Sequence, residues 1–332
     1  MRRVRASVLV LLVWLAAFAA PAHAEEPAER GRIAYSRFDP STGEPRITVA
    51  DPNGMHTHVL ALPFPSDNPV WSPDGNRILL FVFRPDGPPR PATVASDGSD
   101  FRVLEVPAMP PDVDIRCTAW SPYSVRLLCQ ISRAAGGDPV LNGIYTIRAS
   151  DGGGVRRLTT NPYPPSGDFG GGDIPGDFSP DGSRFVFMRA KPGPEPTPDI
   201  GQSGALFVGK SDGSDVRQIT QYGVPNSHDN GLARWSPDGN KILFASEQGE
   251  LMLVRPGDTH LTQIDLKIGG ETFAFSPGWS PDGKRIVTSV FVQQSGQEDI
   301  YTADSDGTHP SQVTNTSDFE DVNANWARHS RR

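Results

Sequence analysis

Short apolar runs, each opened by an arginine or a lysine, recur along the chain. Four of them lie at 77–81, 184–187, 241–244 and 285–287. Apolar runs of this length, bounded by turn residues, are typical of buried β-strands. The pattern therefore predicts a β-rich protein in which each of these runs is a buried strand.

A turn motif stands before each of these runs. Trp-Ser-Pro-Asp-Gly is complete at 71–75, 235–239 and 279–283, has Phe for Trp at 178–182, keeps three residues at 120–122 and only the aromatic at Trp326. Proline presets φ and glycine takes a positive φ, so the motif predicts a tight hairpin between antiparallel strands. Five of the six tryptophans occupy this position, which chance would not produce.

A second turn motif recurs once in each repeat, like the first. An Asp-Gly pair, or Asn-Gly in the first copy, supplies a glycine at Gly54, Gly98, Gly152, Gly213 and Gly307. An apolar residue follows each glycine six positions later. Each repeat of roughly 50 residues thus predicts four antiparallel strands, which is typical of a β-propeller blade.

The two ends of the chain are complementary fragments of one repeat. Residues 31–62 read as the last three strands of a blade, and the region of Trp326 reads as the first strand. Pairing them completes a sixth blade and leaves no open sheet edge. We therefore predict an all-β, six-bladed β-propeller over residues 31–332, built of four-stranded antiparallel blades and closed by N-terminal strands pairing with the C-terminal strand.

Composition and charge narrow the class of protein further. The chain has 34 Gly and 33 Pro in 332 residues, and both residues break helices. The formal net charge of −8 disfavours nucleic acid as a partner. No apolar run beyond residue 24 approaches the roughly 20 residues of a membrane span. We expect a monomeric propeller with no membrane span.

The first 24 residues have the layout of a secretory signal. Arg2, Arg3 and Arg5 precede an apolar run at 7–20, and Ala22-His23-Ala24 supplies the small residues of a cleavage site. We predict a signal peptide over 1–24, a short linker over 25–30, and export to the periplasm or the extracellular medium. The alternative is an uncleaved anchor.

The repeat resembles that of the TolB-type propellers, which are relatives of the WD repeats. The resemblance rests on the Trp-Ser-Pro-Asp-Gly motif, covers about residues 31–329, and implies six blades and export. It departs at one point: TolB carries an α/β domain between its signal and its propeller, where this chain has only residues 25–30. Similar propellers accompany prolyl oligopeptidase-type peptidases and form some pectin-fragment lyases, so the resemblance supports the fold more than a function.

Acidic residues precede the aromatic residue of the turn motif in several repeats. The candidate ligand-binding residues are Asp67, Asp114, Asp173, His228, Asp229 and Asp321. Six blades would bring them to one mouth of the central channel, where gathered carboxylates favour a cation, an amine or a basic peptide. The alternative is that these are ordinary solvated loop carboxylates.

The predicted function is therefore that of an exported binding or scaffold propeller. TolB receives peptide partners at a propeller mouth, so the resemblance implies a protein or peptide partner at the acidic loop face. We assign no catalytic residue, because Gly278 to Asp282 departs from a Gly-x-Ser-x-Gly nucleophile motif at its last position. We expect no cofactor, with a divalent cation such as calcium as the exception.

A loop-site enzyme is the alternative function. A carbohydrate lyase or hydrolase, with or without a metal, could be built from scattered loop residues without a linear motif. His228 beside Asp229 is then the best candidate for acid–base or metal chemistry.

The two cysteines flank the incomplete turn motif symmetrically. Cys117 and Cys129 would lie opposite each other on adjacent strands of a hairpin. An exported protein permits a disulfide between them. A register change of one residue would instead put them on opposite faces as two buried thiols, and both interpretations stay open.

Overall fold

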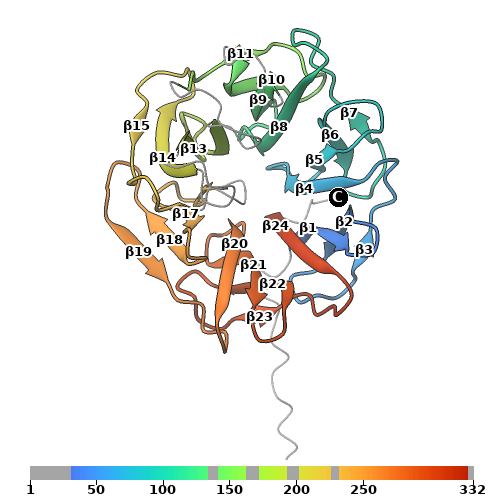
Figure 1. Cartoon of the computed structure of the whole chain (residues 1–332), viewed down its shortest axis with the longest axis vertical. Coiled ribbons are helices and arrows are strands. Elements are labelled where there is room, and N and C mark those ends of the chain that lie inside the picture. Colours follow the sequence, from blue (N-terminus) through green and yellow to red (C-terminus); the bar gives the residue numbers. More distant parts are fainter. Residues whose placement is uncertain (1–30, 134–140, 162–171, 193–201, 226–231, 328–332) are drawn as a thin grey trace, which may run out of the picture.

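The computed structural model describes residues 31–133, 141–161, 172–192, 202–225 and 232–327. Within these ranges the strands form six four-stranded antiparallel sheets, arranged as blades around one axis (Figure 1). The predicted all-β, six-bladed propeller is confirmed. The described residues contain no helix with the length and apolar character that crossing a membrane requires.

In each blade, the strand named first lies next to the axis and the strand named last lies outermost. Blade 1 has β24 (Glu320–Ala327), β1 (Arg32–Asp39), β2 (Glu44–Ala50) and β3 (His58–Val59). Blade 2 has β4 (Ser66–Trp71), β5 (Arg77–Val82), β6 (Arg90–Ala95) and β7 (Arg102–Val103). Blade 3 has β8 (Val113–Trp120), β9 (Arg126–Arg133), β10 (Gly143–Arg148) and β11 (Arg156–Arg157).

The second half of the ring repeats the same order. Blade 4 has β12 (Asp173–Phe178), β13 (Arg184–Pro192), β14 (Gln202–Lys210) and β15 (Arg217–Gln218). Blade 5 has β16 (Arg234–Trp235), β17 (Ile242–Ala245), β18 (Leu251–Val254) and β19 (Leu261–Ile264). Blade 6 has β20 (Thr272–Trp279), β21 (Arg285–Val292), β22 (Gln297–Asp304) and β23 (Ser311–Gln312).

The core lies between the blades. Ile78, Leu79 and Leu80 are consecutive in β5 and all fully buried, although their side chains alternate between the two faces of the sheet. One apolar cluster joins Leu79 to blade 3, and another joins Ile78 and Leu80 to blade 1. The predicted buried strands are thus apolar on both faces because each blade packs against two neighbours.

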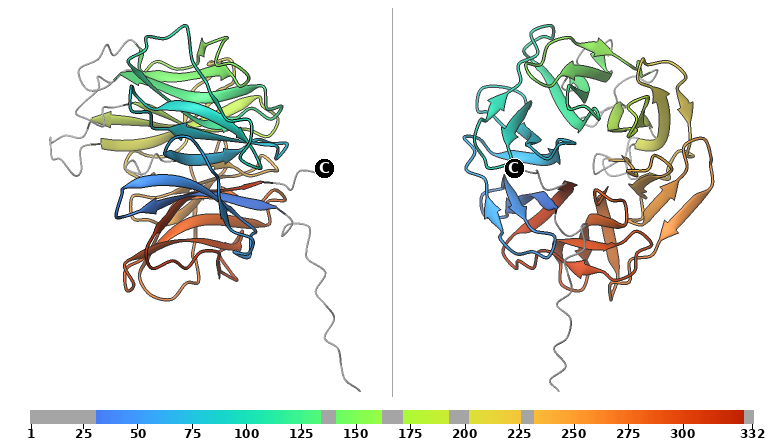
Figure 2. Two further views of the ribbon diagram at one scale, coloured as in Figure 1. Left: turned by 90° about the vertical axis from the view of Figure 1, so that its right-hand side faces the viewer. Right: turned by 180° about the vertical axis from the view of Figure 1, so that it is seen from behind.

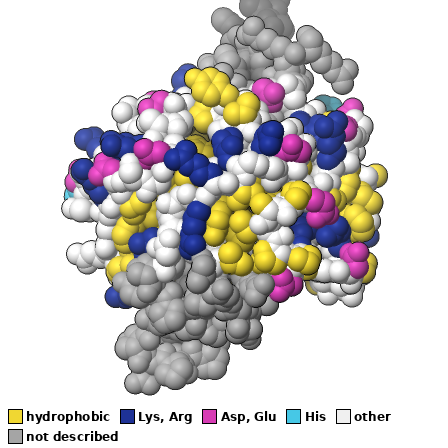
Figure 3. Space-filling model, turned by 90° about the horizontal axis from the view of Figure 1, so that it is seen from above, with side chains coloured by type: hydrophobic (Ala, Val, Ile, Leu, Met, Phe, Trp, Pro, Cys, Tyr) yellow, Lys and Arg dark blue, Asp and Glu magenta, His cyan; other side chains and the backbone are white. Residues whose placement is uncertain are grey.

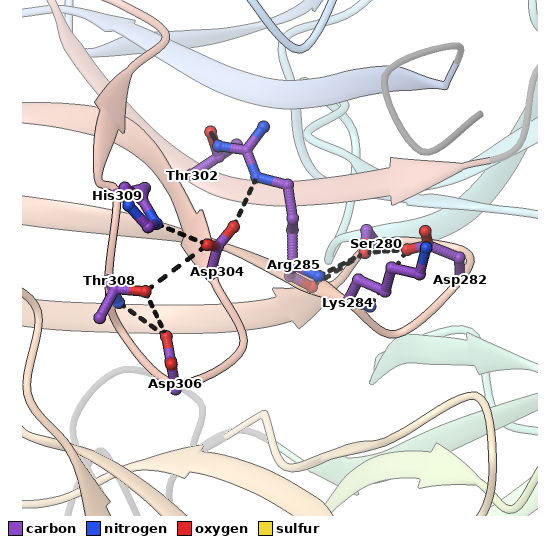
Figure 4. Close-up of polar contacts among 9 residues, drawn as sticks. All are labelled: Ser280, Asp282, Lys284, Arg285, Thr302, Asp304, Asp306, Thr308 and His309. Atoms are coloured by element: carbon purple, nitrogen blue, oxygen red, sulfur yellow. Dashed lines mark hydrogen bonds and ion pairs between the residues drawn. The ribbon is translucent and has the colours of Figure 1, made fainter. Parts of the chain in front are cut away.

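The Ser-Pro-Asp-Gly turns use their side chains as predicted for tight hairpins. In blade 6, the Ser280 hydroxyl donates to Asp282 Oδ1 at 2.8 Å and accepts the Arg285 amide at 2.9 Å (Figure 4). Gly283 takes a φ of 72°, which glycine tolerates without a steric cost. The second turn lies beside it, where Asp306 accepts from Thr308. We call this end of the ring the turn end and the opposite end the loop end.

The two ends of the chain close the ring together. β24 pairs antiparallel with β1, and Ile33 lies opposite Trp326 in the register. Figure 2, from behind, shows the C-terminal strand beside the N-terminal strands. The predicted closure is confirmed, and the edge of β1 that would otherwise be open is paired with β24.

Candidate functional site

The structure places four of the predicted acidic residues at the loop end of the innermost strands. Asp67, Asp114, Asp173 and Asp321 lie within the first residues of β4, β8, β12 and β24, rather than in the loops before them. His228 and Asp229 lie outside the described residues. The four described residues come from blades 1 to 4, and their strands surround the axis (Figure 1).

Two of these carboxylates are buried in ion pairs with arginines of the neighbouring strand. Asp321 binds Arg37 through Nε at 2.7 Å and Nη2 at 2.8 Å. Asp173 binds Arg189 in the same two-pronged way, at 2.7 Å for each contact. Both aspartate side chains are fully buried. Because each carboxylate has its own guanidinium, these two residues add little net negative charge to the loop end.

Each of these arginines also lies over aromatic rings. The Arg37 guanidinium is 5.3 Å from the centre of the Phe319 ring, and that of Arg189 is 5.1 Å from the centre of the Phe207 ring. Such cation–π contacts hold the planar group in a fixed orientation. The sequence pattern gave no sign of these partners, because the arginines lie far from the aspartates along the chain or across a long hairpin.

Asp67 has no ion-pair partner among the described residues, whereas Asp114 pairs with Arg116. Asp67 Oδ1 accepts from Ser36 Oγ at 2.6 Å and Asn323 Nδ2 at 3.1 Å, which ties blade 2 to blade 1. Asp114 Oδ2 accepts from Arg116 at 2.9 Å, and its buried Oδ1 has no hydrogen-bond partner among the described residues. Burial raises the pKa of Asp114, and Arg116 opposes that increase. Both side chains are half-buried.

A disulfide joins Cys117 to Cys129. The two residues lie opposite each other in β8 and β9, and both are fully buried. The hairpin between them is the one without glycine, and Ser124 takes a φ of 57° there. Of the two interpretations that the sequence left open, the structure has the bonded one.

Loss of this disulfide is expected to destabilise the propeller. The two cysteines are separated by 12 positions in the sequence. For a closed loop of this length, chain entropy predicts a stabilisation of about 3 kcal/mol. The double variant Cys117→Ala/Cys129→Ala should therefore unfold at lower urea concentration than the wild type. Reductant should lower the wild-type midpoint and leave the variant unchanged. A wild-type midpoint that reductant does not move would contradict a stabilising disulfide.

A cavity lies on the axis at the turn end, among the predicted hairpin turns. This axial cavity has a volume of about 380 Å³. Its walls are the aromatic residues and prolines of the repeated turn motif, together with polar side chains at Asp177, Arg234 and Asn325. These three residues directly precede Phe178, Trp235 and Trp326, at a position occupied by Val70, Ala119 and Gly278 in the other blades.

Arg234 reaches from blade 5 to blades 3 and 4. Its Nη1 donates to the carbonyl oxygens of Thr118 at 2.8 Å and Gly176 at 3.4 Å. Gly176 lies in a β-bulge of β12, and Thr118 lies in a corresponding bulge of β8. A bulge leaves backbone groups unpaired, which is why these carbonyls are available. Burial lowers the pKa of Arg234.

Asp177 lies on the strand beside Arg234 and carries the opposite charge. Its carboxylate accepts the amides of Phe178 at 2.8 Å and Trp235 at 3.3 Å. Burial raises the pKa of Asp177 to about 6, against the attraction of Arg234 and these hydrogen bonds. The sequence offered one signal for this site, which is that three of six copies have a polar residue directly before the aromatic one.

Comparison with known proteins identifies the fold class. No family model and no curated protein matches the chain. TolB from Acinetobacter baumannii superposes with a TM-score of 0.66 at 18% identity, over 90% of this chain and 67% of that one. A chain of a nidogen/laminin complex gives 0.62 at 8% identity, over 91% and 100% of the two chains. An oligogalacturonate lyase in complex with manganese gives 0.50 at 14% identity, over 85% and 72%.

The protein is therefore a closed six-bladed β-propeller. Its fold is similar to that of TolB. Identities this low establish the fold alone.

Proposed function

We propose that the chain is an exported binding propeller that engages a protein or peptide partner through the acidic residues at the loop end of its axis. The observation that carries the proposal is the convergence of four innermost strands that each have an aspartate among their first two residues, at Asp67, Asp114, Asp173 and Asp321. The predicted signal peptide over 1–24 supports export. TolB and a nidogen/laminin complex provide the same fold in binding proteins.

The electrostatics favour a basic partner at this end. Asp173 and Asp321 are compensated by buried arginines, and Asp114 pairs with Arg116. Asp67 is therefore the aspartate of the four that has no arginine partner among the described residues and would attract a cationic group most strongly. The outer surface in Figure 3 carries Lys and Arg side chains interspersed with Asp, Glu and hydrophobic ones. Because charges of both signs mix on this side of the ring, we propose that the charge-selective surface lies at the mouth of the axis rather than on this side.

A lysine tetrapeptide tests the proposal. We expect a fluorescently labelled tetralysine to bind the wild type at about 0.1 M ionic strength, where the Debye length is about 10 Å, and a tetraglutamate to bind no more than a blank. Fluorescence anisotropy measures the binding. The variant Asp67→Asn/Asp114→Asn removes two carboxylates from the mouth and should weaken tetralysine binding by roughly tenfold or more, since each close charge pair contributes about 1 kcal/mol or more.

The matched control removes the same charge elsewhere. Asp258 and Asp306 are exposed and lie in turns. Asp258→Asn/Asp306→Asn should bind tetralysine within about twofold of the wild type, because exposed charges more than a Debye length away are largely screened. Equal losses in the two double variants would show that only net charge matters, and this outcome would refute a site at the loop end.

The second candidate is a metal-dependent enzyme with a loop-built site. Its support is the oligogalacturonate lyase in complex with manganese, which has the same fold. Among the described residues, no group of three or more His, Cys, Asp or Glu side chains could hold a metal ion. His228 and Asp229 are the candidates that the sequence offers for such a site. Manganese bound at one equivalent and lost in Asp229→Ala would favour this function over plain binding.

A further inference from the structure

Arg234 has hydrogen-bonding capacity that the fold does not use. The residue is 7% exposed and lines the axial cavity. Its partners among the described residues are the carbonyl oxygens of Thr118 and Gly176, and both are bound by Nη1. Nε and Nη2 have no acceptor among the described residues, so they can donate to a ligand in the cavity. A guanidinium presents this edge to a carboxylate as two parallel N–H donors.

The protein itself shows what this edge of an arginine binds. Arg37 holds Asp321 through Nε and Nη2, and Arg189 holds Asp173 through the same two atoms. All three arginines are mostly buried. Arg234 is the one of the three for which the described residues supply no carboxylate on that edge. A carboxylate brought by a ligand would complete the same arrangement.

Asp177 supplies the opposite charge in the same cavity. It lies on β12, next to the strand of Arg234, and forms no ion pair with a described residue. Its backbone partners, the amides of Phe178 and Trp235, neutralise the carboxylate only in part. An ammonium group within hydrogen-bond distance would pair with it.

We propose that the axial cavity binds a small zwitterion, an amino acid or a dipeptide, whose carboxylate pairs with Arg234 and whose ammonium group pairs with Asp177. The volume of about 380 Å³ suits a ligand of that size, since small-molecule sites begin at roughly 300 Å³. This site lies at the turn end and is independent of the function proposed for the loop end.

The dipeptide L-alanyl-L-phenylalanine and two blocked forms test the proposal on the unmodified protein. Its C-terminal amide lacks the carboxylate, and its N-acetyl form lacks the ammonium group. We expect isothermal titration calorimetry to show binding of the free dipeptide and roughly tenfold or weaker binding of each blocked form, because each loses a charge-assisted contact. No binding of the free dipeptide at millimolar concentration, or equal affinity for all three compounds, would overturn the proposal.

Two variants assign the ends of the ligand. Arg234→Lys keeps the positive charge but loses the two parallel N–H donors. It should therefore weaken binding of the free dipeptide and of the N-acetyl form by similar factors. Asp177→Asn should weaken binding of the free dipeptide. Binding of the N-acetyl form should stay unchanged, because that form has no ammonium group to pair with Asp177. Circular dichroism melting would show that each variant is folded. A folded Asp177→Asn protein that weakens both compounds equally would contradict the assigned orientation.

Discussion

Deletion of residues 320–332 is expected to abolish cooperative folding of the propeller. The deletion removes β24, the innermost strand of blade 1, and with it the buried side chains of Ala324, Trp326 and Ala327. β1 would lose its inner partner, and the apolar cluster between blades 1 and 6 would lose Ala324 and Trp326. The exposed strand edges would favour aggregation over refolding. Urea denaturation followed by tryptophan fluorescence should show no sharp transition.

A shorter deletion provides the control. Removal of residues 328–332 leaves β24 complete, so its unfolding midpoint should match that of the full chain. If the protein without residues 320–332 also unfolded in one sharp transition at the wild-type midpoint, β24 would not be the strand that closes the ring.

The second large effect is expected at the buried ion pair of blade 1. Asp321→Ala leaves the Arg37 guanidinium, which is 17% exposed, without its carboxylate. Breaking a buried pair in this way typically costs about 3–5 kcal/mol, because the remaining charge stays desolvated and unpaired. The loss would appear as a lower urea midpoint with an unchanged slope of free energy against urea concentration.

Replacing both partners is the informative comparison. The double variant Arg37→Met/Asp321→Leu keeps the volume and removes both charges, so its free energy of unfolding should lie within roughly 1–2 kcal/mol of the wild type. Asp321→Ala should therefore be less stable than the double variant. Equal stability of the two proteins would show that the ion pair itself, and not the unpaired charge, determines the loss.

The repeated local signals were sufficient to predict the fold. The Ser-Pro-Asp-Gly turn at 279–283 fixes a hairpin through contacts within six residues, such as Ser280 to Arg285. Apolar runs such as that in β5 identify the buried strands, and the complementary ends identify the closure that β1 and β24 make. Each of these features depends on neighbours in sequence or on counting repeats, and both are visible without a structure.

The chemistry on the axis was visible only in part. Asp173 and Asp321 were recognised as acidic residues near the axis, but their arginines come from other strands, and Arg37 is 284 positions from Asp321. Arg234 was not recognised at all, because its contacts are the carbonyls of Thr118 and Gly176, which become available only where β8 and β12 bulge. No local pattern reports such long-range pairings.

The sequence and the tertiary structure determined different features of this protein. By itself the sequence determined the six-fold repeat, its turns and its closure, because turn chemistry and hydrophobic periodicity act over a few residues. The tertiary structure decided which charges are neutralised, that Cys117 and Cys129 are bonded, and that Asp177 and Arg234 share a cavity. These depend on which blades become neighbours and on the register of their strands, and only the closed ring fixes both.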